Sequence, residues 1–155
     1  MELVNNDLIG DVEALYIQPV LSDIRLEWDW VNIGVREILE GQPTYTYRPE
    51  DVYSSCINEE SYLFTQDKTK FAIVSITVDK YTTDKTLFMW LCWVDPKVRV
   101  GKNILRHIDF FETIAKNEGC RYLETVTTSK ALSRLYTSVG MDLTAMHYRR
   151  EIGVN

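Results

Sequence analysis

A segment in the second half of the chain has the composition of an anion-binding turn. It consists of Val94-Asp95-Pro96-Lys97-Val98-Arg99-Val100-Gly101-Lys102-Asn103 and joins an apolar run to an amphipathic one. Where such a turn leads into a helix N-terminus, consecutive backbone N–H groups form a concave donor site, and the helix dipole adds positive potential. A pyrophosphate can bind there with few cationic side chains, which suits a chain of net charge -6.

The cysteines and histidines of the chain are not spaced as in a disulfide framework, a metal site or a known catalytic motif. Cys56, Cys92 and Cys120 are odd in number and far apart, which fits neither a disulfide framework nor a zinc site. Cys92 lies in an apolar run, where a thiol is typically a small hydrophobic residue. His107 and His147 have no ligand-like neighbours, so no metal is expected. The absence of G-x-S-x-G and of G-x-x-x-x-G-K-[ST] argues against a hydrolase and a nucleotide triphosphatase.

Two helices are predicted in the first part of the chain. From Pro19 to Glu40, apolar residues recur at the spacing of one helical face, and Gly41 ends the pattern. These apolar residues are Ile24, Trp28, Val31, Val35 and Ile38. A second, shorter helix is predicted to begin at Pro49, because proline needs no hydrogen bond in the first turn of a helix.

The middle of the chain predicts three consecutive strands. Residues 62–65, 71–78 and 87–94 are rich in β-branched and aromatic side chains, and polar segments separate them. The third run is apolar without alternation. It should therefore be covered on both faces and lie centrally in the sheet.

A crossover through a long helix is predicted next. Ile104 to Ala115 has helical periodicity and Gly119 ends it, after which 122–127 predicts a strand, 131–139 a short helix and 143–151 a last strand. This order indicates an α/β fold with a mixed, mostly antiparallel sheet, helices on both faces and one βαβ crossover. We expect one domain over residues 1–155, with N-terminal helices in 1–60 and the sheet in 61–155.

Three segments resemble motifs of the GNAT (GCN5-related N-acetyltransferase) superfamily. Val94 to Arg99 matches V-x-P-x-x-R, with which the fourth strand of the family ends. Ala115 to Cys120 is similar to its A-x-x-x-G-C helix ending, and Leu135 to Met141 is similar to its L-Y-x-x-x-G-F segment. The resemblance covers about residues 61–152 and implies the GNAT fold.

The resemblance also implies acetyl-coenzyme A (acetyl-CoA) as cofactor. The pantetheine arm would pair like an extra strand with the end of the fourth strand, and the pyrophosphate would bind the following turn. The residues to which the resemblance assigns cofactor binding are Trp93, Val94, Arg99, Val100, Gly101, Lys102 and Asn103.

Tyr136 and Glu124 are the candidate catalytic residues. Tyr136 stands where many GNAT enzymes have the tyrosine that protonates the departing thiolate, although its ring could instead pack the short helix against the sheet. The acceptor amine must lose a proton, and Glu124 is the carboxylate predicted within the fourth and fifth strands. Glu124 could equally be a solvated residue or a partner of Arg121 or Lys130.

Three functions are open at this point, one of which is a CoA-binding regulator that would bind the cofactor without turnover. The resemblance implies an acetyl-CoA-dependent N-acetyltransferase acting on an unknown amine, which V-x-P-x-x-R and Tyr136 favour. In its long first helix, in Arg48-Pro49-Glu50-Asp51-Val52 and in its Trp-rich fourth strand, the chain also resembles small GNAT-like proteins encoded by bacteriophages. This resemblance implies a catalytically silent virion or assembly protein that acts by protein–protein contact. Gly101 precedes the family's first glycine position by one residue, and this favours the silent alternative.

The composition is that of a soluble globular protein. Of 155 residues, 45% are hydrophobic and 26% are charged. The net charge of -6 opposes binding to nucleic acid, and no apolar run approaches the ~20 residues that cross a bilayer. We therefore expect a cytoplasmic protein, in a host cell or a virion if it is phage-encoded. Its expected partners are acetyl-CoA and an amine, or other phage proteins, with no nucleic acid and no membrane.

Overall fold

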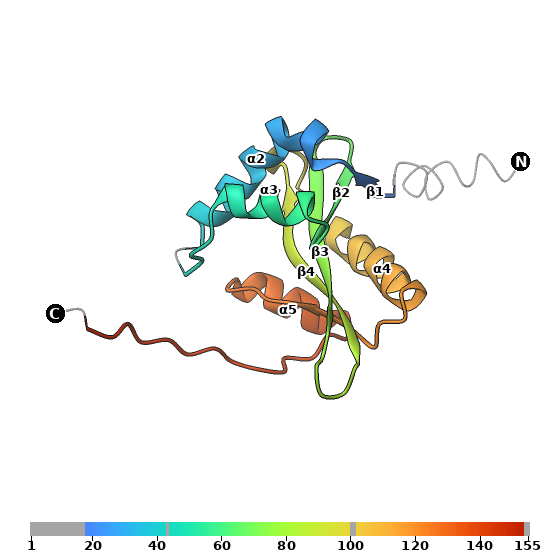
Figure 1. The fold of residues 1–155 in the computed structure, drawn as a ribbon, viewed down its shortest axis with the longest axis vertical. Helices are drawn as coiled ribbons and strands as arrows, with labels where there is room; N and C mark the ends of the chain where they lie inside the picture. Colours follow the sequence, from blue (N-terminus) through green and yellow to red (C-terminus); the bar gives the residue numbers. More distant parts are fainter. Residues whose placement is uncertain (1–17, 43, 100–101, 154–155) are drawn as a thin grey trace, which may run out of the picture.

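The computed structural model describes residues 18–42, 44–99 and 102–153, and for residues 102–105 the backbone alone (Figure 1). Five strands form one sheet in the order β1-β2-β3-β4-β5. The strands are β1 (Val20–Ser22), β2 (Tyr62–Gln66), β3 (Lys70–Val78), β4 (Lys85–Val94) and β5 (Tyr122–Thr125). The helices are α2 (Ile24–Glu40), α3 (Pro49–Ile57), α4 (Lys102–Asn117) and α5 (Lys130–Ser138), with a 3-10 helix η1 at Pro96–Val98.

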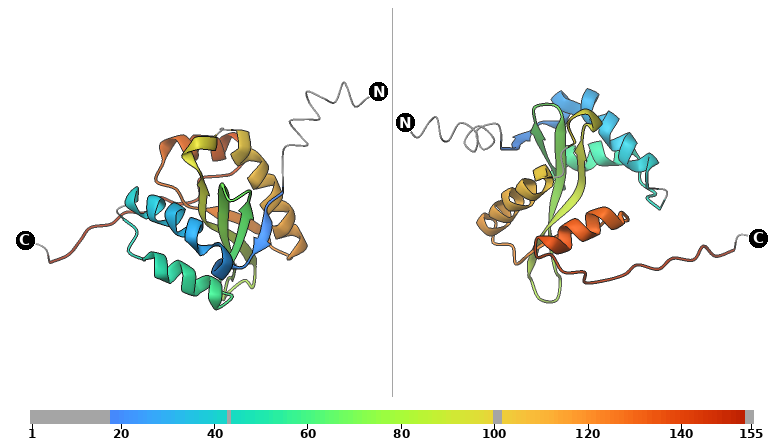
Figure 2. Two further views of the ribbon diagram at one scale, coloured as in Figure 1. Left: turned by 90° about the horizontal axis from the view of Figure 1, so that it is seen from above. Right: turned by 180° about the vertical axis from the view of Figure 1, so that it is seen from behind.

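The sheet is mixed and mostly antiparallel, as predicted. Strands β1 to β4 pair antiparallel with their neighbours, and β5 pairs parallel with β4 after the crossover through α4. Helices α2 and α3 cover one face, and α4 covers the other (Figures 1 and 2). Tyr136 of α5 packs against the core beneath α4. The predicted α/β fold with helices on both faces is confirmed.

The prediction of one helix from Pro19 to Glu40 is wrong at its start. Residues Val20–Ser22 form the short edge strand β1, and α2 begins only at Ile24. Asp23 separates the two elements because its side chain accepts a hydrogen bond from the Arg25 backbone N–H at 2.9 Å and so caps the helix. A strand of three residues is too short to show a period, so the sequence pattern could not reveal it.

The predicted last strand over residues 143–151 is also wrong. Residues 142–153 have no strand assignment, and among the described residues no backbone–backbone hydrogen bond reaches them. Their composition is typical of a strand, but a strand exists only when a neighbouring strand accepts its hydrogen bonds. No segment of the described chain provides that neighbour.

A β-bulge explains why β4 lacks alternation. Against β3, Met89 pairs with Val74 and Leu91 pairs with Ile73, so Trp90 is an extra residue. The bulge exchanges the two faces of the sheet to which alternate side chains of β4 point. Leu87 and Met89 pack beneath α4, whereas Leu91 and Trp93 pack beneath α2 and α3. The run is therefore covered on both faces, as predicted.

The core beneath α2 depends on a close approach at Gly34. This glycine faces the stacked rings of Phe71 and Trp93, whose centroids are 5.7 Å apart. A Cβ atom at Gly34 would lie 2.5 Å from the Phe71 ring and 2.6 Å from the Trp93 ring. Because both rings are buried, neither can move away cheaply.

We expect Gly34→Ala to destabilise the fold. Overpacking costs roughly 1–3 kcal/mol, and contacts of 2.5 and 2.6 Å with buried rings place this substitution at the upper end; the better helix propensity of alanine returns about 1 kcal/mol, so the net loss is roughly 2 kcal/mol. Gly41→Ala is the matched control, because its Cβ would meet nothing closer than 3.5 Å. Urea denaturation checks both variants. Equal stability of Gly34→Ala and wild type would contradict the packing described.

Candidate active site

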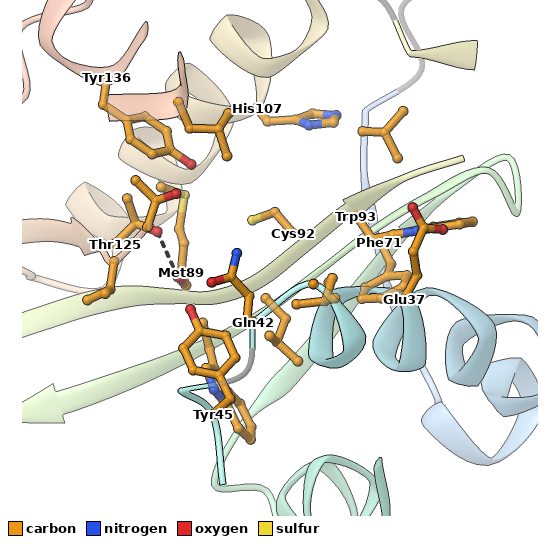
Figure 3. Close-up of a pocket in the computed structure, with 18 of the residues that line it drawn as sticks. Glu37, Gln42, Tyr45, Phe71, Met89, Cys92, Trp93, His107, Thr125 and Tyr136 are labelled. Carbon is orange, nitrogen blue, oxygen red and sulfur yellow. Dashed lines mark hydrogen bonds between the residues drawn. The ribbon is translucent and has the colours of Figure 1, made fainter. Parts of the chain in front are cut away.

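A pocket lies where β4 and β5 part. The two strands pair only from Thr86 with Tyr122 to Met89 with Thr125. Beyond Met89, residues 90–94 of β4 have no β5 partner, and a cavity of about 520 Å³ lies in the gap (Figure 3). Its walls come from strands β3, β4 and β5, from helices α2, α4 and α5, and from residues that follow α2, η1 and β5.

A hydrogen bond joins β4 and β5 at the point where the two strands separate. The Thr125 hydroxyl donates to the Met89 carbonyl oxygen at 3.0 Å (Figure 3). The bulge residue Trp90 comes next along β4, and a bulge bends a strand and increases its twist. The gap therefore opens where β4 loses its β5 partner and where its pairing with β3 is interrupted for one residue.

Tyr136 presents a protonated hydroxyl to the pocket. Its side chain extends from α5 into the cavity, on the same side as Thr125 (Figure 3). Burial raises the pKa of Tyr136 to about 12, and a hydrogen bond with Thr125 offsets part of that rise. The hydroxyl therefore holds its proton at neutral pH and can donate it to an anion that forms in the cavity.

Cys92 and His107 face the same cavity as neutral groups. Cys92 lines the cavity, to which its side chain is exposed, and desolvation by the surrounding protein raises the pKa of its thiol to about 12 (Figure 3). Desolvation, together with the nearby charge of Lys70, lowers the pKa of His107 to about 4. His107 Nε2 lies 3.1 Å from Oε1 of the buried Gln66. The middle of the pocket is thus uncharged at neutral pH.

Hydrogen bonds and an ion pair connect α2 to the end of β4 that has no β5 partner. The Trp93 indole N–H donates to Glu37 Oε2 at 3.1 Å, and Arg99 Nη2 lies 2.5 Å from Glu37 Oε1. Arg99 Nε also donates to the Val94 carbonyl oxygen at 2.9 Å. The hydrogen bond from Trp93 and then that from Arg99 lower the pKa of Glu37. These contacts hold the end of β4 in place where it lacks a β5 partner.

The opposite side of the pocket is formed by residues that follow α2. Gln42 and Tyr45 line it, and the Thr128 hydroxyl donates to the Gln42 side-chain carbonyl. Thr128 follows β5, so this hydrogen bond links the two loops at the mouth of the gap. The Tyr45 ring stacks on Tyr47 with centroids 5.3 Å apart.

The structure brings four of the predicted site residues to one pocket. Trp93, Val94, Arg99 and Tyr136 all line it. Glu124 does not line it; this residue is exposed on β5, opposite Phe88. Its role as a base stays a prediction that the geometry does not support. The alternative pairing with Arg121 is not seen either, because Arg121 pairs with Asp84 at 2.9 Å.

The remaining predicted residues belong to the turn before α4. Val100 and Gly101 lie outside the described residues. Lys102 and Asn103 form the start of α4, and only their backbone is described. Their roles in cofactor binding stay predictions.

Sequence reasoning missed one wall of the pocket. Glu37, Gln42 and Tyr45 lie in or after the first helix, about fifty residues before β4, and carry no motif. A single sequence does not show that Glu37 on α2 faces Trp93 of the sheet. Thr125 lies in the strand predicted over residues 122–127, but no sequence signal marks it as the last paired residue.

The described part of the chain meets the requirements of neither a metal site nor a membrane-spanning helix. No group of three His, Cys, Asp or Glu side chains there could hold a metal ion. No helix among the described residues is both long and apolar enough to cross a membrane.

Several solved structures with a similar fold carry the name of an acetyltransferase. A ribosomal-protein-alanine N-acetyltransferase from Brucella melitensis biovar Abortus 2308 matches with a TM-score of 0.67 at 12% identity, over 88% of this chain and 100% of that one. The aminoglycoside N-acetyltransferase AAC(6')-Iy in complex with CoA matches with a TM-score of 0.60 at 14% identity, over 86% and 99%. The chain has the GNAT fold.

A third match has the same GNAT fold. A protein from Bacillus halodurans, solved as a tetramutant, matches with a TM-score of 0.70 at 12% identity, over 88% of this chain and 100% of that one. No protein-family model and no curated protein sequence matches the chain. At such identities the likeness establishes the GNAT fold alone.

We expect Glu37 to make stability depend on pH. Because the folded-state pKa of Glu37 is lowered below its ordinary value of 4.5, its carboxylate stabilises the fold above that pH. This contribution disappears as the pH falls through the lowered folded pKa. The stability difference between wild type and Glu37→Gln should therefore shrink from neutral pH to about pH 3.

Chemical denaturation across that pH range checks the expectation. Glu40→Gln is the control, since Glu40 is an exposed residue of the same helix and makes no ion pair among the described residues. A pH-independent difference for Glu37→Gln would show that its carboxylate does not stabilise the end of β4.

Proposed function

We propose that the protein is an acetyl-CoA-dependent N-acetyltransferase that acts on an amine. The observation that carries the proposal is the open gap between β4 and β5, lined by the protonated hydroxyl of Tyr136. The GNAT fold of the solved acetyltransferases supports it. The phage-protein alternative has no comparable support.

The shape and chemistry of the gap fit an acyl-pantetheine arm. Residues 90–94 of β4 have no partner strand on the β5 side, so their backbone can pair with the amides of an extended ligand. The side chains around the gap are mainly apolar and uncharged in the middle, which suits a thioester. The backbone N–H groups at the start of α4 would hold the pyrophosphate.

Acetyl-CoA, when bound, supplies a thioester whose acetyl group passes to the amine nitrogen with loss of the thiolate. Tyr136 is placed to give its phenolic proton to a thiolate in the pocket, and its raised pKa keeps that proton in place until it is needed. Gln42 and Tyr45 form the wall opposite Tyr136 and are positioned to contact the acceptor (Figure 3). The amine proton leaves to water, because Glu124 does not line the pocket.

The tryptophans of β4 do not close the gap. A silent GNAT-fold protein could fill it with Trp90 or Trp93. Trp93 instead stacks on Phe71 beneath α2, and Trp90 packs against Tyr47 with ring centroids 5.1 Å apart. About 520 Å³ of space is left. This favours a site that binds a ligand.

We expect acetyl-CoA to bind with micromolar affinity, and Cys92→Trp to abolish that binding. The Cys92 side chain points into the cavity, so an indole there occupies the space of the ligand (Figure 3). Tyr81→Trp is the control, since Tyr81 is 83% exposed in the turn between β3 and β4. Calorimetric titration measures both, with thermal melts to confirm that each variant is folded.

Two outcomes would contradict the assignment of the pocket. One is the absence of wild-type binding at near-millimolar acetyl-CoA. The other is unchanged affinity in a folded Cys92→Trp variant.

We expect Tyr136→Phe to lower kcat at least about 100-fold, the usual contribution of a general acid. Affinity for acetyl-CoA should stay the same, because the ring is kept and only the hydroxyl is removed. The measurement is release of free CoA with a panel of amines, using Glu124→Gln as a control that should retain turnover. Unchanged kcat in Tyr136→Phe would exclude the acid role, and cofactor binding without turnover on any amine would indicate a CoA-binding regulator.

A further inference from the structure

The wall of the pocket opposite Tyr136 is aromatic and uncharged. Gln42, Tyr45 and Trp90 line it. Figure 3 shows Gln42 and Tyr45 across β4 from Tyr136. The Tyr45 ring stacks on Tyr47, and the centroid of the Tyr47 ring lies 5.1 Å from that of Trp90. These contacts join three rings into one surface, on which a flat aromatic ligand can pack.

The pocket offers no carboxylate to a positively charged ligand. Among the described residues that line it, the titratable side chains are those of Glu37, Tyr45, Cys92, Arg99, His107 and Tyr136. Both carboxylate oxygens of Glu37 are engaged, Oε2 by the Trp93 indole N–H and Oε1 by the Arg99 guanidinium. An ammonium group would therefore meet no carboxylate that is free to pair with it in the described part of the pocket.

The described groups of the pocket are also poor acceptors for a proton at neutral pH. Hydrogen bonds, first of all the one from Trp93, lower the pKa of Glu37. Desolvation is the main cause that lowers the pKa of His107 to about 4. Burial raises the pKa values of Cys92 and Tyr136 to about 12, so both groups already hold their protons. The reacting amine must therefore enter without a charge.

This requirement separates two kinds of amine. An alkylamine with the basicity of lysine, whose pKa is about 10.4, is neutral in roughly one molecule of 2,500 at pH 7. An amine whose lone pair is delocalised into an aromatic ring is a far weaker base and is almost entirely neutral at that pH. A cation–π contact with one tyrosine ring returns less free energy than burial of an unpaired ammonium costs. The wall therefore favours the weaker base.

We propose that the acceptor is an aromatic monoamine whose amino group is attached to the ring and is uncharged at neutral pH. This inference rests on the proposed acetyltransferase function and gives the chemical class of its acceptor. The ring of the acceptor packs on the surface formed by Tyr45, Tyr47 and Trp90, and its nitrogen points through the gap toward Tyr136.

Gln42 is suited to a neutral ligand and not to a cation. The Thr128 hydroxyl donates to the Gln42 side-chain carbonyl, and the amide nitrogen of Gln42 points toward the middle of the pocket (Figure 3). This nitrogen can donate hydrogen bonds but cannot accept them, so it binds an uncharged acceptor atom and disfavours an ammonium group. A polyamine would meet the same mismatch at each of its charges.

With such an acceptor, the transfer step needs no base in the pocket. The neutral nitrogen attacks the thioester carbonyl carbon, so that a C–N bond forms and the C–S bond breaks. The departing thiolate takes the phenolic proton of Tyr136, and the nitrogen loses one N–H proton to water. Tyr136 then regains a proton from water.

The test compares p-toluidine with benzylamine, two isomers that differ in basicity and not in composition. Equilibrium dialysis against the full-length protein saturated with CoA measures their binding without turnover. At pH 7, p-toluidine is expected to bind at least about 100-fold more tightly, and the affinity for benzylamine should rise about 10-fold per pH unit up to its own pKa. Spermidine, a polyamine, should not bind.

Two variants test the wall itself. Tyr45→Leu is expected to weaken binding of p-toluidine roughly 5-fold, because it removes a ring contact. Tyr81→Leu is the control and should bind like wild type, since Tyr81 is 83% exposed in the turn between β3 and β4. Gln42→Glu supplies the missing carboxylate and should strengthen binding of benzylamine at pH 7 at least about 10-fold, without strengthening that of p-toluidine. Thermal melts confirm that each variant is folded.

Several outcomes would overturn the inferred acceptor class. They are no binding of p-toluidine, equal and pH-independent affinities for the two isomers, binding of spermidine, and unchanged binding in folded Tyr45→Leu and Gln42→Glu variants. Release of free CoA from acetyl-CoA separates these failures from that of the proposed function. Binding of p-toluidine without its acetylation would contradict the transferase alone, whereas turnover of benzylamine or spermidine in preference to p-toluidine would contradict the acceptor class alone.

Discussion

The divergence of β4 from β5 after Met89 is the constraint on which the site depends. Pairing with β5 ends at that residue, and pairing with β3 is interrupted at the next, where Trp90 is inserted as a bulge. One extra residue thus has two effects. It turns Leu91 and Trp93 toward α2, which divides the core between two faces, and it comes where β4 bends away from its parallel neighbour.

A strand that loses a neighbour needs another means of support. Here the support comes from α2, through the contacts of Glu37 with Trp93 and Arg99, and from the close approach that Gly34 permits. The same contacts hold the Trp93 ring beneath α2, so that it does not fill the gap. The packing of Trp93 beneath α2 therefore both stabilises this face of the sheet and leaves the pocket open. A substitution that disturbs this packing should also change the pocket.

Much of the fold could be predicted from the sequence, because amphipathic periodicity reports burial directly. The helix that ends before Gly41, the helix from Pro49, the meander and the crossover all follow from the spacing of apolar residues and from glycine or proline at their ends, although the start of the first helix does not. The position of the bulge, the edge strand β1 and the unpaired state of 143–151 could not be predicted, since each depends on which segments meet in space. For the same reason Tyr136 and Val94 were found through motifs, whereas Glu37, which has no motif, was missed.

The most direct test of the account is amide hydrogen exchange with and without acetyl-CoA, mapped along the chain. The account predicts that the cofactor slows exchange in residues 90–94 and 125–127, the two sides of the gap, while exchange in the exposed turn of residues 79–84 stays unchanged. Binding that leaves residues 90–94 and 125–127 unprotected, or that protects a different face of the sheet, would contradict the claim that the parting of β4 and β5 forms the cofactor site.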